Sequence, residues 1–267
     1  MNSKDFVEGL KQRLLIEFKK QDRSGVYGYT QRSMAYNSNK IEGSTLTEKQ
    51  TASMFHTGTL YTDDPDVIFR TKDIEEMNGH FKMFNYIMKN MYEPLSEDLI
   101  KEMHKNLKEG VFEDFANGYA VGEWKKRENR VSDINVALPK EVPEKIHQLL
   151  ASYTGKENIE LKDIAEFHAK FENIHPFQDG NGRVGRMIIL KQCLDSNIIP
   201  VIIRDSNKAE YYRFLNKAQH EEDYNGLVRY FEKEQRYYVD NTIRMLYTSE
   251  ELNIINNDSI DDVIDSI

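Results

Sequence analysis

A twelve-residue stretch, residues 175–186, contains side chains that could bind a phosphate and move a proton. It reads His-Pro-Phe-Gln-Asp-Gly-Asn-Gly-Arg-Val-Gly-Arg and holds three of the chain's fourteen glycines. Glycine permits left-handed backbone angles and close approach of the backbone to a ligand. Residues 183–194 are apolar with a helical period, so the loop leads into a helix N-terminus, where N–H groups and the helix dipole favour an anion. The stretch therefore predicts an anion-binding loop.

The charged side chains of this stretch suit a polyphosphate with a divalent cation. Arg183 and Arg186 lie three residues apart and share a helix face, where two cations oppose the helix dipole unless an anion binds between them. Asp179 could hold a divalent cation that bridges phosphates. His175, with an ordinary pKa of about 6.5, could take a proton from a hydroxyl nucleophile. The alternative is a plain turn between two helices, with solvated arginines and a capping histidine.

The rest of the chain reads mainly as helices, which must position this loop. Six prolines and fourteen glycines are few for 267 residues, and apolar residues recur at helical spacing. Gly43 is expected to cap one helix, and Thr47 to start the next through a capping box. The other expected helices cover residues 6–18, 29–42, 71–90, 99–107, 143–153, 160–174, 182–195, 206–220 and 224–247.

Residues 116–138 lack a helical period. They contain Gly118, Gly122, Trp124 and several β-branched residues, which predicts a short β-hairpin or extended flap. This segment also holds a basic cluster in an otherwise acidic protein. The cluster is either a solvated strand edge or a surface that docks a protein target. Its members are Lys125, Lys126, Arg127 and Arg130.

Composition excludes several classes of protein. A net charge of −9 argues against a general nucleic-acid binder, which needs a basic face. Apolar residues at 39% and charged residues at 30% are typical of a globular protein with a sizeable core. No apolar run is long enough to cross a membrane, and charges interrupt the N-terminus, so a signal peptide is not expected. The single cysteine, Cys193, is expected in the core. These features predict a cytoplasmic protein.

At this point the residues resemble a known family. The pattern His-Pro-Phe-x-Asp-Gly-Asn-Gly-Arg-x-x-Arg at residues 175–186 is similar to the signature of the Fic family. Gly122-Glu123-Trp124 with the basic stretch and Val131 resembles the family's flap. Residues 205–223 resemble its nucleotide-pocket helix. The resemblance covers about residues 70–235 and implies a mainly α fold, a helical bundle with a short β-hairpin flap over the active site.

The resemblance implies transfer of AMP from ATP to a Ser, Thr or Tyr hydroxyl of a protein, including the enzyme itself. His175 would be the general base and Asp179 would hold Mg²⁺. Arg186 favours nucleotidyl transfer, because relatives that phosphorylate their targets lack this arginine. Tyr211, Tyr212 and Gln219 could line the nucleotide pocket, and the alternative for the two tyrosines is helix packing. The nucleotide-binding residues would be Gly180, Asn181, Gly182, Arg183, Arg186, Val131, Ser132, Tyr211, Tyr212 and Gln219.

Residues 38–43, Ser-Asn-Lys-Ile-Glu-Gly, fit the family's inhibitory motif. Ser38 and Glu42 lie four apart and share a helix face, from which the carboxylate could pair bidentately with Arg186. That pair would occupy the site of the γ-phosphate. With Gly43, these residues would place the chain in the class whose inhibitory helix precedes the catalytic core. The alternative is a solvated helix end with a glycine cap.

The sequence thus predicts an adenylyltransferase that Glu42 autoinhibits and that could also remove AMP. Residues 1–69 would hold the N-terminal helices, with the inhibitory helix over about 29–43. Residues 70–235 would form the catalytic core, and residues 236–267 a C-terminal helix and acidic tail. The alternatives are a transferase with another nucleotide or phosphocholine donor, and a non-catalytic nucleotide-binding module. Expected partners are ATP and a protein target, with no nucleic acid or membrane. The oligomeric state is not readable.

Overall fold

The computed structural model describes residues 3–64, 66–129, 134 and 136–246. This part of the chain is mainly helical and contains no β-strand, which confirms the predicted fold class. Its elements are α1 (Ser3–Lys20), α2 (Val26–Ile41), α3 (Glu48–Thr57), α4 (Thr71–Lys89), α5 (Glu97–Lys108), α6 (Phe112–Asn117), η1 (Pro139–Glu141), α7 (Val142–Thr154), α8 (Leu161–Ile174), α9 (Asn181–Asp195), η2 (Asp205–Asn207), α10 (Lys208–Glu221) and α11 (Asn225–Leu246).

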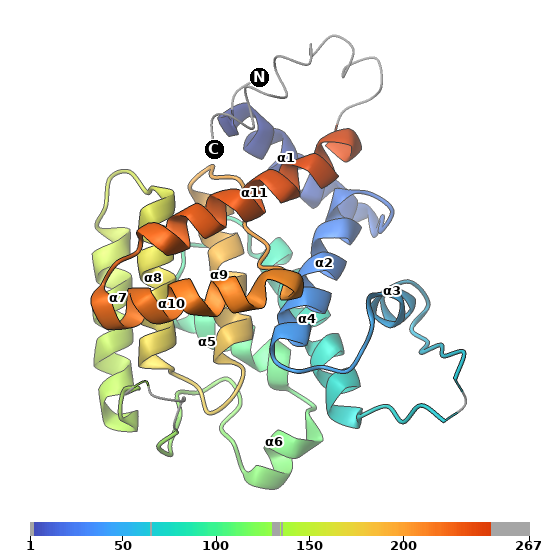
Figure 1. The fold of residues 1–267 in the computed structure, drawn as a ribbon, viewed down its shortest axis with the longest axis horizontal. Coiled ribbons are helices and arrows are strands. Elements are labelled where there is room, and N and C mark those ends of the chain that lie inside the picture. Colours follow the sequence, from blue (N-terminus) through green and yellow to red (C-terminus); the bar gives the residue numbers. More distant parts are fainter. Residues whose placement is uncertain (1–2, 65, 130–133, 135, 247–267) are drawn as a thin grey trace.

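The helix that follows the glycine-rich loop, α9, runs through the middle of the bundle (Figure 1). It packs against α8, α5, α2 and α4. Apart from Gly182, every residue from Asn181 to Leu194 is buried. A helix that is covered on all sides is fixed by its neighbours rather than by its own propensity. The loop at its N-terminus is therefore held by the core of the protein.

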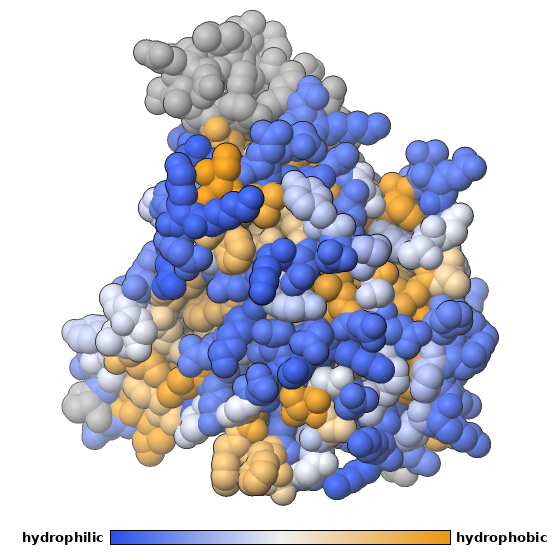
Figure 2. All heavy atoms as spheres, turned by 180° about the vertical axis from the view of Figure 1, so that it is seen from behind, coloured by the Kyte–Doolittle hydropathy of each residue, from blue (hydrophilic) through white to orange (hydrophobic). Residues whose placement is uncertain are grey.

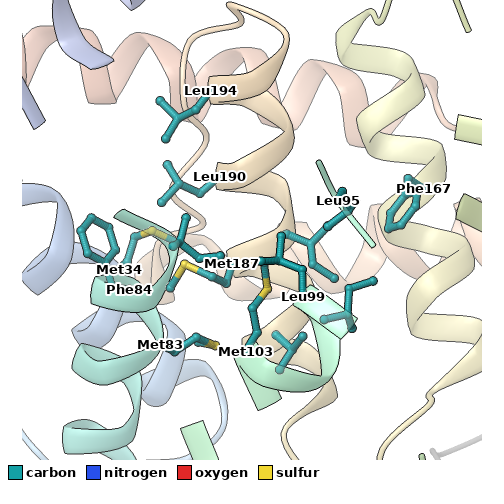
Figure 3. Close-up of a cluster of buried hydrophobic side chains, with 14 of the residues drawn as sticks. Met34, Met83, Phe84, Leu95, Leu99, Met103, Phe167, Met187, Leu190 and Leu194 are labelled. Atoms are coloured by element: carbon teal, nitrogen blue, oxygen red, sulfur yellow. The ribbon is translucent and has the colours of Figure 1, made fainter. Parts of the chain in front are cut away.

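The core around α9 is rich in methionine and leucine. Figure 3 shows side chains from several helices converging on the apolar face of α9. Methionine is unbranched and fills irregular gaps between helices that cross at different angles. The labelled members of this cluster are Met34, Met83, Phe84, Leu95, Leu99, Met103, Phe167, Met187, Leu190 and Leu194.

A close crossing of α4 and α5 brings two polar residues together beneath the loop. Gly79 on α4 lies so near α5 that a Cβ atom there would be 1.9 Å from the carbonyl oxygen of Leu107. Next to this crossing, Nζ of Lys108 lies 2.5 Å from Oε1 of Glu76. The approach is possible only because residue 79 has no side chain.

Most expected helices are present, with ends shifted by a few residues. The predicted capping box of α3 is confirmed, since Thr47 accepts from the N–H of Gln50 and donates its own N–H to the Gln50 side chain. Helix α6 was not expected, and it includes the first residues of the predicted flap. Gly118 ends α6 in a left-handed conformation.

The predicted hairpin falls partly outside the described residues. Residues 118–129 are irregular, with no strand. Val131, Ser132 and Arg130 lie outside the described residues, as does the tail from residue 247, so the hairpin and the nucleotide contacts of Val131 and Ser132 stay predictions. None of the described helices has both the length and the apolar character needed to span a bilayer. The face opposite that of Figure 1 is mainly hydrophilic, with scattered apolar side chains (Figure 2).

Candidate active site

His175 lies at the junction between α8 and the loop. It is the C-cap of α8, with a left-handed backbone (φ 50°), and its N–H donates to the Phe171 carbonyl at 2.9 Å. Nδ1 of the imidazole is buried without a hydrogen-bond partner. Burial, followed by the positive charge of Lys125, lowers the pKa of His175 to about 4. The imidazole is therefore neutral near pH 7 and able to accept a proton.

The loop is folded by a side chain that reaches back to its own beginning. Asn181 accepts from the N–H of Phe177 at 2.7 Å and donates to its carbonyl at 2.8 Å. Gly180, with φ 83°, makes the left-handed turn that starts α9. Phe177 is buried and stacks on the ring of His104 with centroids 3.9 Å apart, which anchors the loop.

Asp179 lies among cations. Its Oδ2 accepts from Nζ of Lys108 at 2.7 Å, and its Oδ1 accepts from the N–H of Gly180 at 2.7 Å. Although burial opposes ionisation, the charges of Arg183 and Lys108 hold the pKa of Asp179 well below its usual range. About one third of the side chain is exposed, at 34%. Asp179 is therefore an ionised carboxylate that a ligand can still reach.

Lys108 and Arg183 form a buried charge network with acidic residues of other helices. Lys108, 1% exposed, also lies 3.0 Å from Oδ2 of Asp114. Arg183, 2% exposed, pairs with Oε2 of Glu76 at 2.5 Å and lies 3.4 Å from Oδ2 of Asp179. Its Nε is buried without a partner. Arg183 is therefore a buried side chain paired with carboxylates, and not a solvated one.

Arg186 contacts the helix that precedes the core. Its Nε donates to Oγ of Ser38 at 2.8 Å, and its NH2 donates to the carbonyl of Ser38 at 3.1 Å. The same NH2 lies 2.6 Å from Oε1 of Glu42. The contact uses one carboxylate oxygen, whereas the sequence suggested two. Gly43 follows with φ 88° and ends the helix.

A second carboxyl lies behind Arg186. Glu172 is buried, its Oε1 has no partner, and burial raises its pKa to about 8. A Cβ atom on Gly185 would lie 2.5 Å from this oxygen and 3.2 Å from Cε1 of His168. His168 is buried, with its Nε2 2.7 Å from the hydroxyl of Tyr211.

The expected nucleotide-pocket residues of α10 have different surroundings. Tyr211 is buried and bound to His168, which is the packing alternative, whereas 44% of Tyr212 is exposed. Gln219 lines a solvent-open pocket of about 740 Å³ between α7, α8 and α10. Asn173, two residues before His175, lines the same pocket. The nucleotide contacts of Tyr211, Tyr212 and Gln219 stay predictions.

Two residues that sequence reasoning missed help to build this site. Glu76 and Lys108 come from α4 and α5, whose apolar patterns suggested only core packing. The sequence of α5 held a signal, because the polar residues His104 and Lys108 lie one turn apart on one face. In the structure both are buried against the loop. In the basic cluster, Lys126 and Arg127 are exposed as expected of a solvated edge, but Lys125 is 2% exposed.

Comparison with known proteins links this geometry to a family. The model of the Fic/DOC family matches residues 94–193. The chain is 28% identical over 189 residues to Protein adenylyltransferase Fic of Nematostella vectensis, covering 69% of this chain and 42% of that protein. It is 26% identical over 225 residues to Protein adenylyltransferase fic-1 of Caenorhabditis elegans, covering 83% and 42%. The chain thus spans less than half the length of these relatives.

Solved structures with this fold include two Fic proteins. A Fic domain containing signaling protein from Bacteroides thetaiotaomicron aligns with TM-score 0.71 and 23% identity, covering 88% of this chain and 97% of that chain. Fic-1 from C. elegans aligns with TM-score 0.67 and 23% identity, covering 88% and 69%. At these identities the likeness concerns the fold.

Proposed function

We propose that this chain, which carries a Fic/DOC domain over residues 94–193, is a protein adenylyltransferase that moves AMP from ATP to a protein hydroxyl. The observation that carries the proposal is a neutral His175 on the same loop as a helix N-terminus and two arginines. The chain's similarity to two proteins named as adenylyltransferases supports the same activity. The chain's target, its cytoplasmic location and the division at residues 70 and 235 are parts of this proposal.

The proposed step is an in-line displacement. His175 takes the proton of a Ser, Thr or Tyr hydroxyl, and the hydroxyl oxygen attacks the α-phosphorus of ATP. The bond from that phosphorus to the bridging oxygen breaks, and pyrophosphate leaves. The N–H groups of Asn181 and Gly182, that of Gly180 once it leaves Oδ1 of Asp179, and the guanidinium of Arg186 would stabilise the phosphates. Arg183, with an unpartnered buried Nε, adds positive charge to the same place.

Asp179 fits a role as the protein's ligand to Mg²⁺. Its ionised carboxylate is one third exposed, and Mg²⁺ typically takes one or two carboxylates together with phosphate oxygens and waters. No group of three acidic, His or Cys side chains suited to a metal occurs in the described part of the chain, so Asp179 would hold the ion with the nucleotide. Bound Mg²⁺ would offset phosphate charge, and Lys108 would keep the carboxylate ionised and in place.

The proposal includes autoinhibition by α2. Glu42 occupies NH2 of Arg186 at 2.6 Å, so the γ-phosphate of ATP would compete with a carboxylate for this guanidinium. Ser38 accepts from Nε and from the same NH2 of this guanidinium. Since 32% of the Glu42 side chain is exposed, it can rotate away without loss of the buried face of α2. Inhibition would then depend on one side chain.

Labelled ATP tests the proposal directly. Glu42→Gly should incorporate AMP well above the wild-type level, and His175→Ala should abolish incorporation in both backgrounds. A folded Glu42→Gly protein with an unchanged or lower rate would overturn autoinhibition. Mass spectrometry for a 5′-AMP adduct separates an enzyme from a binding module, and calorimetry with ATP, UTP and GTP separates the donors. Release of AMP from a modified protein, measured in the same preparation, tests whether the chain also removes AMP.

A further inference from the structure

We propose that Lys125 is a positioning residue for His175: with Asn129 it clamps the backbone that carries the imidazole and keeps the imidazole ready to accept a proton. The proposal rests on the proposed function in treating His175 as the base. The clamp itself is a property of the fold and can be measured without any catalysis. It assigns a role to the beginning of the flap, which the sequence marked only as part of a basic cluster.

In the clamp, Lys125 and Asn129 donate hydrogen bonds to three backbone carbonyl groups around His175. The N–H of Lys125 donates to the carbonyl of Pro176 at 2.8 Å, and its Nζ donates to the carbonyl of Ile174 at 3.4 Å. Nδ2 of Asn129 donates to the carbonyl of Phe177 at 3.0 Å. The two side chains are joined, because Nζ of Lys125 also donates to Oδ1 of Asn129 at 2.7 Å. The flap therefore binds both neighbours of His175.

These hydrogen bonds hold the backbone on both sides of His175, whose own backbone conformation is unfavourable. His175 has φ 50°, and a non-glycine residue persists in the left-handed region only where its surroundings hold it there. The bonded carbonyls of Ile174 and Pro176 lie immediately before and after it. The ring of Trp124 packs on the ring of Phe177 with centroids 5.1 Å apart, which holds the beginning of the flap against the loop. Lys125 thus fixes the direction in which the imidazole points.

The ammonium of Lys125 is buried with neutral partners. It is 2% exposed, and its hydrogen bonds go to an amide oxygen and a backbone carbonyl. In the described part of the chain no carboxylate lies within 4 Å of it. Burial lowers its pKa to about 8, with Glu141 opposing this shift and Lys145 adding to it. Lys125 therefore stays mostly charged at neutral pH.

The charge of Lys125 acts on His175 together with two opposing acids. After burial, it is the largest influence that lowers the pKa of His175. A backbone hydrogen bond raises that pKa, as do the charges of Glu42, the C-cap of α2, and Asp179 of the loop. A cation beside an imidazole disfavours a second positive charge, so the ring stays neutral and its nitrogen stays free. Lys125 is the cation that balances the two carboxylates around the base.

NMR titration of His175 in the full-length chain tests the clamp. In Lys125→Met the pKa of His175 should rise by about one unit or more, because a unit charge within about 12 Å at an effective dielectric constant of about 20 contributes at least that shift. Lys125→Arg should keep the wild-type titration. The matched control is Lys126→Met, which removes an exposed charge at the next residue and should leave the His175 titration unchanged. Should Lys125→Met fail to fold, Lys125→Gln replaces it.

A second readout separates positioning from mere stability. In the Glu42→Gly background, the acid limb of the pH–rate profile should move to higher pH in Lys125→Met. In Lys125→Arg it should lie at the same pH as with Lys125 in place. An unchanged His175 titration in folded Lys125→Met or Lys125→Gln overturns the proposal. A loss of rate in these variants with an unchanged pH–rate profile overturns it as well. If no variant transfers AMP while the His175 pKa shifts as expected, the proposed function fails and the clamp stands.

Discussion

Replacing Gly79 by alanine tests whether the α4–α5 crossing supports the active site. Helix propensity alone predicts that Gly79→Ala stabilises the protein by about 1 kcal/mol, because glycine is the poorer residue inside a helix. The structure predicts the opposite sign. The added Cβ would lie 1.9 Å from the carbonyl oxygen of Leu107, and this neighbour is backbone that cannot rotate away.

The size of the effect follows from that distance. A carbon and an oxygen in contact need more than 3 Å, so the two helices must separate by about 1 Å or more. Overpacking typically costs about 1–3 kcal/mol, and a rigid neighbour puts this site at the upper end. After the gain in propensity, we expect a net loss of about 2 kcal/mol. The separation would also pull Lys108 from Glu76, whose 2.5 Å contact lies beside the crossing.

Urea unfolding at pH 7 measures the loss. Gly155→Ala is the matched control, because its φ is negative and the nearest atom to an added Cβ, the carbonyl oxygen of Ala151, lies 3.1 Å away. The added Cβ there needs a relief of only a few tenths of an ångström, so this control should change stability by less than about 1 kcal/mol. In the Glu42→Gly background, Gly79→Ala should also lower AMP incorporation, since Lys108 no longer holds Asp179. A Gly79→Ala protein as stable as wild type would refute the argument.

Three further changes have expected outcomes. Lys108→Met should destabilise the protein by about 3–5 kcal/mol in urea unfolding, because buried carboxylates lose their cation, while Lys105→Met, an exposed change on the same helix, should stay near wild type. Glu172 has a folded pKa of about 8, above its ordinary value, so its protonated form stabilises the fold at low pH and this contribution is lost as pH rises. Glu172→Gln should therefore gain stability relative to wild type between pH 5 and 8, by up to about 1.4 kcal/mol per pH unit in denaturant titrations, and a constant difference would contradict the assignment. Thr47→Ala should cost about 1 kcal/mol, seen as a lower melting temperature, because the α3 capping box is lost.

The sequence predicted the loop well because its signals are local. Glycines, an amide and charges within twelve residues define the turn and the start of α9, and Ser38 and Glu42 share a face whatever lies opposite. Helix positions followed from apolar spacing, which burial enforces. The predicted motif therefore needed no knowledge of how the helices cross.

The partners of the motif could not be predicted, since they depend on crossing angles. Glu76 and Lys108 are far apart in the chain and meet through the glycine contact at residue 79. Solvated arginines were the alternative interpretation of the sequence, yet Arg183 is buried and paired with Glu76 of α4. Lys125 looked like its exposed neighbours, yet it is buried, with its N–H bonded to Pro176 and its Nζ bonded to Asn129 and Ile174.

The contact between Gly185 and Glu172 also restricts the order in which this sequence can change. With Glu172 in place, any side chain at residue 185 would meet its carboxyl oxygen at 2.5 Å. A descendant of this protein could lose the carboxyl first, leaving a small void beside the glycine, and gain a side chain at 185 afterwards. The reverse order requires an intermediate with a clash next to Arg186. Among related sequences, the two positions should therefore vary together, with glycine accompanying glutamate.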